Sequence, residues 1–130
     1  MMKSFAIGIA ALVISAGAAL ADPVEGVWKT QPGDDGTYGL VTISTCGNQI
    51  CGVLGQGFDS AGNKIDRGNI GKRMIWYMKS NGGGKYSGGK IWAPDRDKTY
   101  NSKMALSGNK LKVSGCVIGI CRSQTWSRVK

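Results

Sequence analysis

Short stretches of β-branched and aromatic residues run through most of the chain, separated by clusters of Gly, Asn, Asp and Ser. No window keeps apolar residues at spacings of three and four over three helical turns, so the pattern is typical of an all-β domain. The predicted strands are Glu25–Thr30, Tyr38–Cys46, Ile50–Gly55, Met74–Lys79, Tyr86–Ala93, Thr99–Leu106, Lys110–Cys116 and Cys121–Val129. Eight short strands predict a small closed antiparallel barrel.

Most of the predicted strands are joined by short segments that contain Gly or Asn, such as Gly47-Asn48 and Gly108-Asn109. These residues supply the positive φ values and Asx turns that tight hairpins need, so we expect an up-and-down order of strands. The connection from Gln56 to Arg73 is different, because it is long, polar and cationic at its end. We expect it to cross the surface as a flap over one mouth of the barrel.

Alternation along a strand shows which residues share a face, but it does not show which face is buried. In the last predicted strand, Arg122, Gln124, Trp126 and Arg128 share one face. If Trp126 points inward, Arg122 and Gln124 point inward with it, and a cation inside a barrel needs a partner or an anionic ligand. Alternatively, this face looks outward and the long connection covers Trp126. The sequence leaves both alternatives open.

The N-terminus has the pattern of a secretion signal. A short basic start precedes the apolar run Phe5–Leu20 and the A-x-A cleavage pattern Ala19-Leu20-Ala21. A membrane anchor is the alternative, but this run is shorter than the roughly 20 residues that cross a bilayer. We expect residues 1–21 to be a signal peptide and residues 22–130 to form one periplasmic or secreted domain. Most of the predicted strands are shorter than the roughly 9–11 residues of a membrane-spanning strand, so we expect a soluble barrel.

Two cysteine pairs share the spacing C-x4-C, Cys46 with Cys51 and Cys116 with Cys121. Export to an oxidising compartment favours disulfides, and the local pairing is favoured among the three possible ones because each pair flanks a short segment. The alternative is a zinc site ligated by all four cysteines. A redox-active pair is disfavoured, because that chemistry uses C-x-x-C. We predict the disulfides Cys46–Cys51 and Cys116–Cys121, and no metal.

Composition excludes several classes of function. The chain has no histidine, which excludes a Ser-His-Asp triad, a Cys-His dyad and histidine-ligated metals. The segment Asp95–Thr99 has the rhythm of a calcium loop, but it lacks the central Gly and the bidentate Glu. We therefore expect no cofactor and no enzymatic activity. The formal net charge is +9, but export and the lack of a basic cluster interleaved with aromatic residues argue against nucleic acid as a partner.

Five ordered motifs carry a family resemblance. They are Gly26-Val27-Trp28, residues 46–52, residues 88–94, Lys98-Thr99-Tyr100 and Gln124-Thr125-Trp126-Ser127-Arg128. Together they resemble the small exported bacterial proteins grouped as domain of unknown function "twenty-one forty-seven". The resemblance implies a lipocalin-like barrel and no settled activity. It also implies that Gly26 and Trp28 open the first strand and that Arg128 packs over Trp28.

Two hypotheses for the function remain. In the first, the barrel encloses one small amphipathic or anionic molecule. The residues expected to contact it are Tyr100, Arg122 and Gln124 around a carboxylate or phosphate head, and Trp92, Met104 and Trp126 along its apolar part. In the second, aromatic side chains pack the barrel solid, and the cationic segment Lys64–Arg73 with scattered lysines binds anionic lipid or cell-envelope polymer. High salt releases charge-driven binding but not a ligand held in a cavity.

Overall fold

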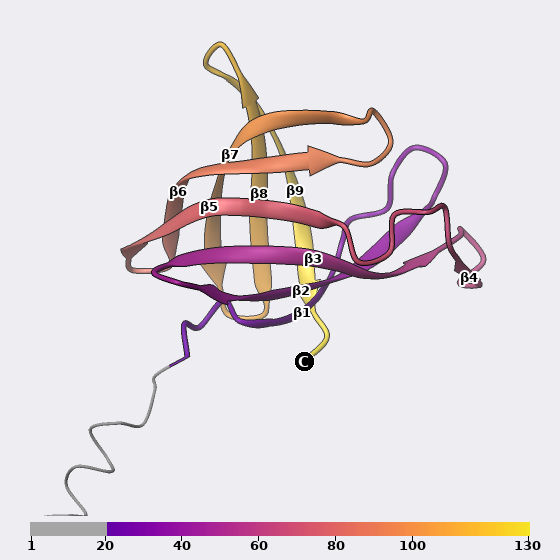
Figure 1. Cartoon of the computed structure of the whole chain (residues 1–130), viewed down its shortest axis with the longest axis horizontal. Helices are drawn as coiled ribbons and strands as arrows, with labels where there is room; N and C mark the ends of the chain where they lie inside the picture. Colours follow the sequence, from indigo (N-terminus) through magenta and orange to yellow (C-terminus); the bar gives the residue numbers. More distant parts are fainter. Residues whose placement is uncertain (1–20) are drawn as a thin grey trace, which may run out of the picture.

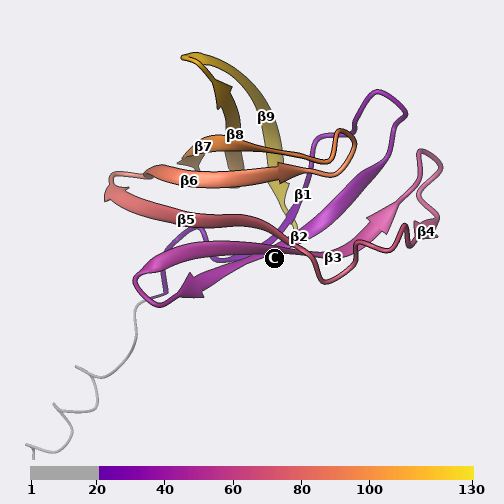
Figure 2. The same cartoon turned by 45° about the horizontal axis from the view of Figure 1, so that its top comes forward.

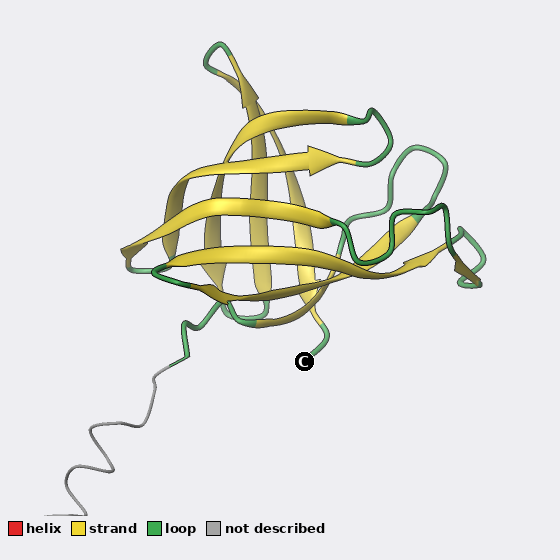
Figure 3. Cartoon of the chain, in the orientation of Figure 1, coloured by secondary structure: helices red, strands yellow, loops and turns green. Residues whose placement is uncertain are grey.

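The computed structural model describes residues 21–130, in which every regular element is a β-strand (Figure 1, Figure 3). Residues 1–20 of the predicted signal peptide lie outside the described residues. The strands are β1 (Gly26–Lys29), β2 (Tyr38–Cys46), β3 (Gln49–Phe58), β4 (Lys64–Ile65), β5 (Arg73–Gly82), β6 (Lys85–Ala93), β7 (Lys98–Ser107), β8 (Lys110–Val117) and β9 (Ile120–Arg128). Within the described part, no helix is long and apolar enough to cross a membrane.

Eight of these strands form one closed antiparallel barrel. Each strand pairs with its neighbour in sequence, with β3 pairing with β5 across the short β4, and β1 pairs with β9 to close the ring. The predicted up-and-down barrel is therefore confirmed. Its closure is narrow, because β1 pairs with β9 at Trp28 and Lys29, and only Val27 extends it, through backbone hydrogen bonds with Val129 and Lys130. In the described chain, the stretch of β9 from Ile120 to Trp126 has no strand on that side.

The long connection predicted between Gln56 and Arg73 is partly strand. β3 continues to Phe58 and turns back through β4. The Asp59 carboxylate orders this turn, because it accepts hydrogen bonds from the backbone N–H groups of Ala61 and Asn63 at 2.9 and 2.8 Å. In both views the resulting hairpin extends from β3 away from β8 and β9 (Figure 1, Figure 2). The segment therefore forms a side hairpin and not the expected flap over the barrel mouth.

The end of the barrel with the two-residue turns 47–48, 83–84 and 108–109 is sealed, and we call it the closed end. The segment Asp22–Glu25 packs against it, and Val24 is fully buried. The Trp28 indole N–H donates to the Val24 carbonyl at 2.9 Å. The Arg128 guanidinium lies 4.4 Å from the centre of the Trp28 ring and donates to two carbonyls of the N-terminal segment at 2.9 and 2.7 Å. This is the arrangement that the family resemblance implied.

Gly26 occupies a position at this end that has no room for a side chain. Its φ is 144°, in the region that favours glycine. A Cβ here would collide with the Lys130 carbonyl oxygen and would lie 2.9 Å from the Arg128 guanidinium. A glycine therefore allows the C-terminus to lie directly beside the start of β1.

A buried tyrosine fastens the N-terminal segment to β6. The Tyr86 hydroxyl donates to the Asp22 carboxylate, and the same carboxylate accepts from the Val24 N–H at 2.9 Å. Burial, followed by this hydrogen bond and the charge of Asp22, raises the pKa of Tyr86 above its usual value. Tyr86 thus holds the segment in place as a neutral donor.

The opposite end carries the connections 30–37, 59–72 and 94–97 and the β8–β9 hairpin, and we call it the loop end. Between the two ends, large apolar side chains fill the barrel. With Val24 and Trp28, those at most 1 % exposed are Val41, Ile43, Ile75, Met78, Leu111 and Trp126. Burying one such side chain stabilises the fold by about 1.5–3 kcal/mol. The middle of the barrel is therefore a packed core.

Candidate functional site

The burial of Trp126 decides the orientation of β9. Trp126 is 1 % exposed and pairs with Leu111, which is fully buried. The face that carries Trp126 therefore looks inward. Gln124 and Arg122 share this face, because alternate residues of a strand lie on one side. Of the two orientations that the sequence left open, the inward one is correct.

Strand register brings five of the six predicted ligand-contacting residues to this inner face. Met104 of β7 is opposite Val113 of β8, which is opposite Gln124 of β9. In the same way, Gly115 of β8 is opposite Arg122. The five residues are Tyr100, Met104, Arg122, Gln124 and Trp126. They come from β7 and β9, which flank β8, and form one continuous part of the barrel wall.

Toward the loop end, this inner face is open to solvent. Arg122 and Gln124 are exposed although they share a face with Trp126, because no strand lies beyond this part of β9 in the described chain (Figure 2). Gln124 accepts a hydrogen bond from the Trp126 indole N–H at 3.0 Å. The Arg122 side chain makes no hydrogen bond or ion pair within residues 21–130. Its charge is therefore available to a ligand.

Ser102 is a buried polar residue on the same face. It is 5 % exposed, and its Oγ has no hydrogen-bond partner among the described residues. Across the sheet it is opposite Gly115, which is opposite Arg122. An unpartnered buried hydroxyl costs about 1–3 kcal/mol and calls for a bound water, ion or ligand. Alternation along β7 places Ser102 on the face of Tyr100 and Met104, but the sequence gives no sign that its hydroxyl is buried.

Apolar side chains extend the inner face beyond Arg122. Val117 and Ile120 pair at the tip of the β8–β9 hairpin and are 50 % and 74 % exposed. By alternation, they lie on the same face as Arg122. Ile91 and Tyr100, opposite each other across β6 and β7, are partly buried nearby. The loop end thus combines an exposed apolar strip with a free cation.

Trp92 lies on the outer side of the barrel wall. It pairs with Thr99, whereas the preceding residue Ile91 pairs with Tyr100 on the inner face. The alternation in β6 thus puts Ile91, and not Trp92, on the face of Tyr100. Trp92 is still only 8 % exposed, since Lys72 covers its ring at 3.8 Å and its indole N–H donates to Asp97 at 2.8 Å.

Two surface depressions lie in the described part of the chain. One, of about 380 Å³, lies outside the barrel and is lined by Lys72, Arg73, Trp76, Trp92, Asp97 and Thr99. The other, of about 240 Å³, lies at the closed end and is lined by Asp22, Thr45, Asn48, Gln49, Ile50 and Ser80. Neither is lined by the five inner-face residues.

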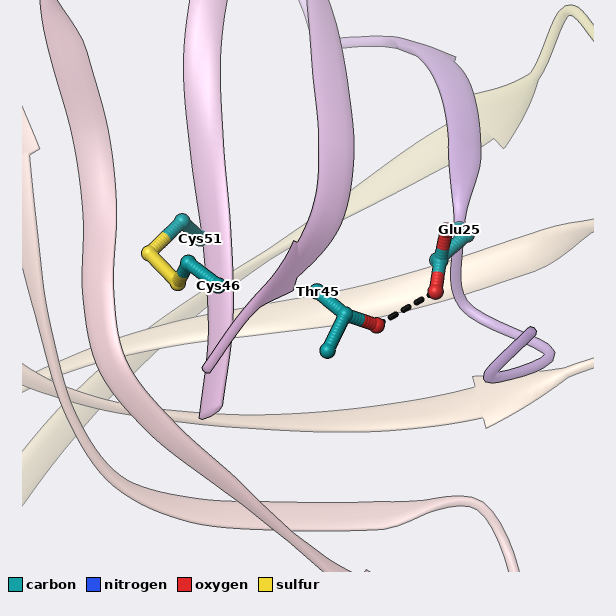
Figure 4. The surroundings of a disulfide bond; sticks show 4 residues. All are labelled: Glu25, Thr45, Cys46 and Cys51. Atoms are coloured by element: carbon teal, nitrogen blue, oxygen red, sulfur yellow. Dashed lines mark hydrogen bonds between the residues drawn. A yellow bond between two sulfur atoms is a disulfide. The ribbon is translucent and has the colours of Figure 1, made fainter. Parts of the chain in front are cut away.

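Both predicted disulfides, Cys46–Cys51 and Cys116–Cys121, are present. Cys116 and Cys121 are directly opposite each other, whereas Cys51 is opposite Ser44, so the first bridge runs diagonally. Figure 4 shows that bridge near the hydrogen bond from Thr45 to Glu25. The described residues contain no free cysteine, which leaves no thiolate there for the alternative zinc site.

The topology, with an arginine of the last strand stacked on a tryptophan of the first, defines a lipocalin-like barrel. Protein HP1028 from the human pathogen Helicobacter pylori, described as belonging to the lipocalin family, is similar over 82 % of this chain and 83 % of that chain, with a TM-score of 0.65 and 18 % identity. At that identity the likeness concerns the fold alone. The family model "Uncharacterized protein conserved in bacteria (DUF2147)" matches residues 26–128, so the chain belongs to that family. No curated protein matches the chain.

Proposed function

We propose that this protein is an exported, non-catalytic binding protein that holds one small amphipathic anionic molecule at the loop end of its barrel. The proposal rests on one observation: a buried hydroxyl without a partner, Ser102, and a free cation, Arg122, share one face. They are two strands apart, about 10 Å between backbones, a gap that a long arginine side chain can shorten. A carboxylate or phosphate can accept hydrogen bonds from both groups.

The surroundings of Arg122 favour an amphipathic ligand. Val117 and Ile120 expose apolar surface on the side toward the hairpin tip, and Tyr100 adds an aromatic ring. An alkyl chain along this strip buries apolar surface on both partners, which stabilises the complex by about 25 cal/mol per Å². The anionic head then lies at Arg122 and Gln124.

Export and the lack of catalysis are parts of the same proposal. The N-terminal sequence pattern and the two disulfides support export to an oxidising compartment. The lack of histidine in the sequence supports a role in binding.

Native mass spectrometry tests for a captured ligand. The mature protein is isolated from an oxidising periplasm without denaturation and is measured at low and high salt. We expect a mass four hydrogens below the reduced value, from two disulfides, and an adduct that persists in high salt. A disulfide-bonded protein without an adduct at either salt concentration would contradict a tightly held ligand.

A titration with dodecanoate then tests the site. We expect saturable binding that Arg122→Gln weakens about tenfold, because one charge-assisted hydrogen bond is lost. Lys112→Gln is the matched control, since it removes the same charge from an exposed position of β8 on the outer face. Equal weakening by both variants, or no saturable binding by the unmodified protein, would count against the site.

A second candidate function uses the outer surface. Residues 98–130 contain seven Lys and Arg residues and no Asp or Glu. Lys103, Lys110 and Lys112 are exposed on the outer face of β7 and β8. Such a surface binds anionic lipid or cell-envelope polymer through long-range attraction. It predicts sedimentation with phosphatidylglycerol vesicles at low salt, release at high salt and no sedimentation with phosphatidylcholine.

A further inference from the structure

Two tryptophans meet two cations outside the barrel, where β5 and β6 lie side by side. Trp76 of β5 is opposite Lys90 of β6, and Trp92 follows Lys90 by two positions on the same face. The indoles of Trp76 and Trp92 are therefore diagonal neighbours on the outer face. Both line the depression of about 380 Å³, together with Lys72 and Arg73. This volume lies within the roughly 300–1,000 Å³ of small-molecule sites.

The two cations rest on indole rings and not against carboxylates. Lys72 Nζ lies 3.8 Å from the centre of the Trp92 ring, and Arg73 Cζ lies 4.6 Å from that of Trp76. A cation–π contact holds a side chain in place without neutralising its charge. Among residues 21–130, neither cation forms an ion pair. Two adjacent positive charges are thus held at one depression and are free to bind an anion.

Asp97 and Thr99 add groups that accept hydrogen bonds. Asp97 Oδ1 accepts from the Trp92 indole N–H at 2.8 Å, while Oδ2 has no partner in the described part. The φ of Asp97 is 49°, a left-handed conformation that is uncommon for non-glycine residues. The depression therefore has a fixed acceptor beside its cations.

We propose that this depression binds a sugar that carries a phosphate or carboxylate group. Lys72 and Arg73 bind the anionic group, and Asp97 and Thr99 accept hydrogen bonds from the sugar hydroxyls. The C–H face of the sugar ring, which is weakly positive, packs on the exposed part of Trp76, because the face of an aromatic ring is negative. The site is separate from the loop-end site, since Trp92 and Tyr100 lie on opposite sides of the barrel wall.

Tryptophan fluorescence of the mature, disulfide-bonded protein tests the proposal, with glucose 6-phosphate, glucuronate, glucose and inorganic phosphate as probes. We expect a saturable change with the first two, and binding at least about tenfold weaker for glucose and for phosphate, because each of these lacks one half of the interaction. No saturable change with the two anionic sugars would overturn the proposal. Equal affinity for inorganic phosphate and glucose 6-phosphate would overturn the sugar assignment.

Variants test whether the sugar binds at this depression. We expect Arg73→Gln to weaken glucose 6-phosphate binding about tenfold, and Trp76→Phe, which keeps an aromatic ring, to weaken it less. Lys103→Gln is the matched control, because it removes one exposed charge from the outer face of β7. Equal weakening by Arg73→Gln and Lys103→Gln would overturn the site in favour of overall charge.

The loop-end variant separates the two proposals. Arg122→Gln should leave sugar binding unchanged, and Arg73→Gln should leave dodecanoate binding unchanged. If Arg122→Gln weakened sugar binding as strongly as Arg73→Gln, this depression would not be the sugar site. If the unmodified protein bound glucose 6-phosphate but not dodecanoate, the loop-end proposal would be contradicted and this one would stand.

Discussion

Arg128 and Arg122 stand on the same face of β9 at opposite ends of the barrel, and their surroundings differ completely. Arg128 stacks on Trp28 and donates to two backbone carbonyls at the closed end. Arg122 is exposed and makes no ion pair within the described chain. One arginine therefore fastens the end of β9 to the segment Asp22–Glu25, while the other keeps its hydrogen-bonding capacity.

Three buried polar side chains follow the same division. At the closed end, the Trp28 indole N–H and the Tyr86 hydroxyl both have partners in the segment Asp22–Glu25. Toward the loop end, the buried Ser102 hydroxyl has none among the described residues. Partnered groups stabilise a fold, whereas groups left unpartnered at a cost are typical of functional sites. This difference supports a structural role for the closed end and the proposed binding role for the loop end.

The largest effect should come from removing the central side chain of the closed end. We expect Trp28→Ala to lower the free energy of unfolding by about 3–5 kcal/mol, because it leaves a large cavity and removes the ring under Arg128. Urea denaturation measures the change. Ile120→Ala, at a position 74 % exposed at the loop end, should stay within about 0.5 kcal/mol of the unmodified protein. Similar losses for both variants would break the distinction between the ends.

The two arginines give the most direct comparison, because the same substitution removes the same charge. Arg128→Gln should lower the free energy of unfolding by about 1.5–3 kcal/mol, since it removes hydrogen bonds from a charged donor to two carbonyls. Arg122→Gln should change stability by less than about 0.5 kcal/mol. Both variants are measured by urea denaturation at one salt concentration. A larger loss for Arg122→Gln would reverse the proposed roles.

Tyr86 makes the closed end sensitive to alkaline pH. Its pKa is raised in the folded protein, so its contribution to stability is complete below the unfolded value, near pH 10, and is lost as the pH rises above it. Above about pH 10, stability should fall by up to about 1.4 kcal/mol per pH unit through this group. In Tyr86→Phe, the free energy of unfolding should fall less steeply between pH 10 and 11. Below pH 9, its pH dependence should run parallel to that of the unmodified protein. An unchanged slope in Tyr86→Phe would contradict this role.

The smallest expected effects concern two buried serines. Ser114 Oγ hydrogen-bonds to Ser123 Oγ at 2.7 Å, whereas Ser102 Oγ has no partner in the described part. We expect Ser114→Ala to lower stability by about 1 kcal/mol and Ser102→Ala to leave it unchanged or to raise it by up to about 1 kcal/mol. Ser102→Ala should also weaken dodecanoate binding. If Ser102→Ala destabilised the protein as much as Ser114→Ala, the hydroxyl would be structural.

Local sequence was sufficient for most of the barrel. Glycine and asparagine at the turns and alternating apolar residues between them located the eight barrel strands, because both signals depend on neighbours along the chain. These local signals underestimated the length of β3, which continues past Gly55 because its pairing with β2 extends to Phe58. They also missed β4, since a strand of two residues has no pattern of its own.

The site was only partly predictable, because a period of two tells which residues share a face and not which face is inside. The sequence determined that Arg122, Gln124 and Trp126 lie together, and that Cys116 and Cys121 are close enough to bond. Only the packing of Trp126 against β8 turned this face inward, and only the register of β6 against β7 put Trp92 outside.

The different roles of Arg122 and Arg128 were likewise decided by contacts between distant residues. The bond from Arg128 to Pro23 joins residues 105 positions apart in the sequence. Arg122 lacks a partner because β1 pairs with β9 only near its end, so that no strand lies beside Arg122 in the described chain. The sequence by itself therefore located the eight barrel strands and their turns and favoured the two disulfide pairs, because these depend on local spacing. The tertiary structure alone decided which polar groups are satisfied, because that depends on which distant strands meet.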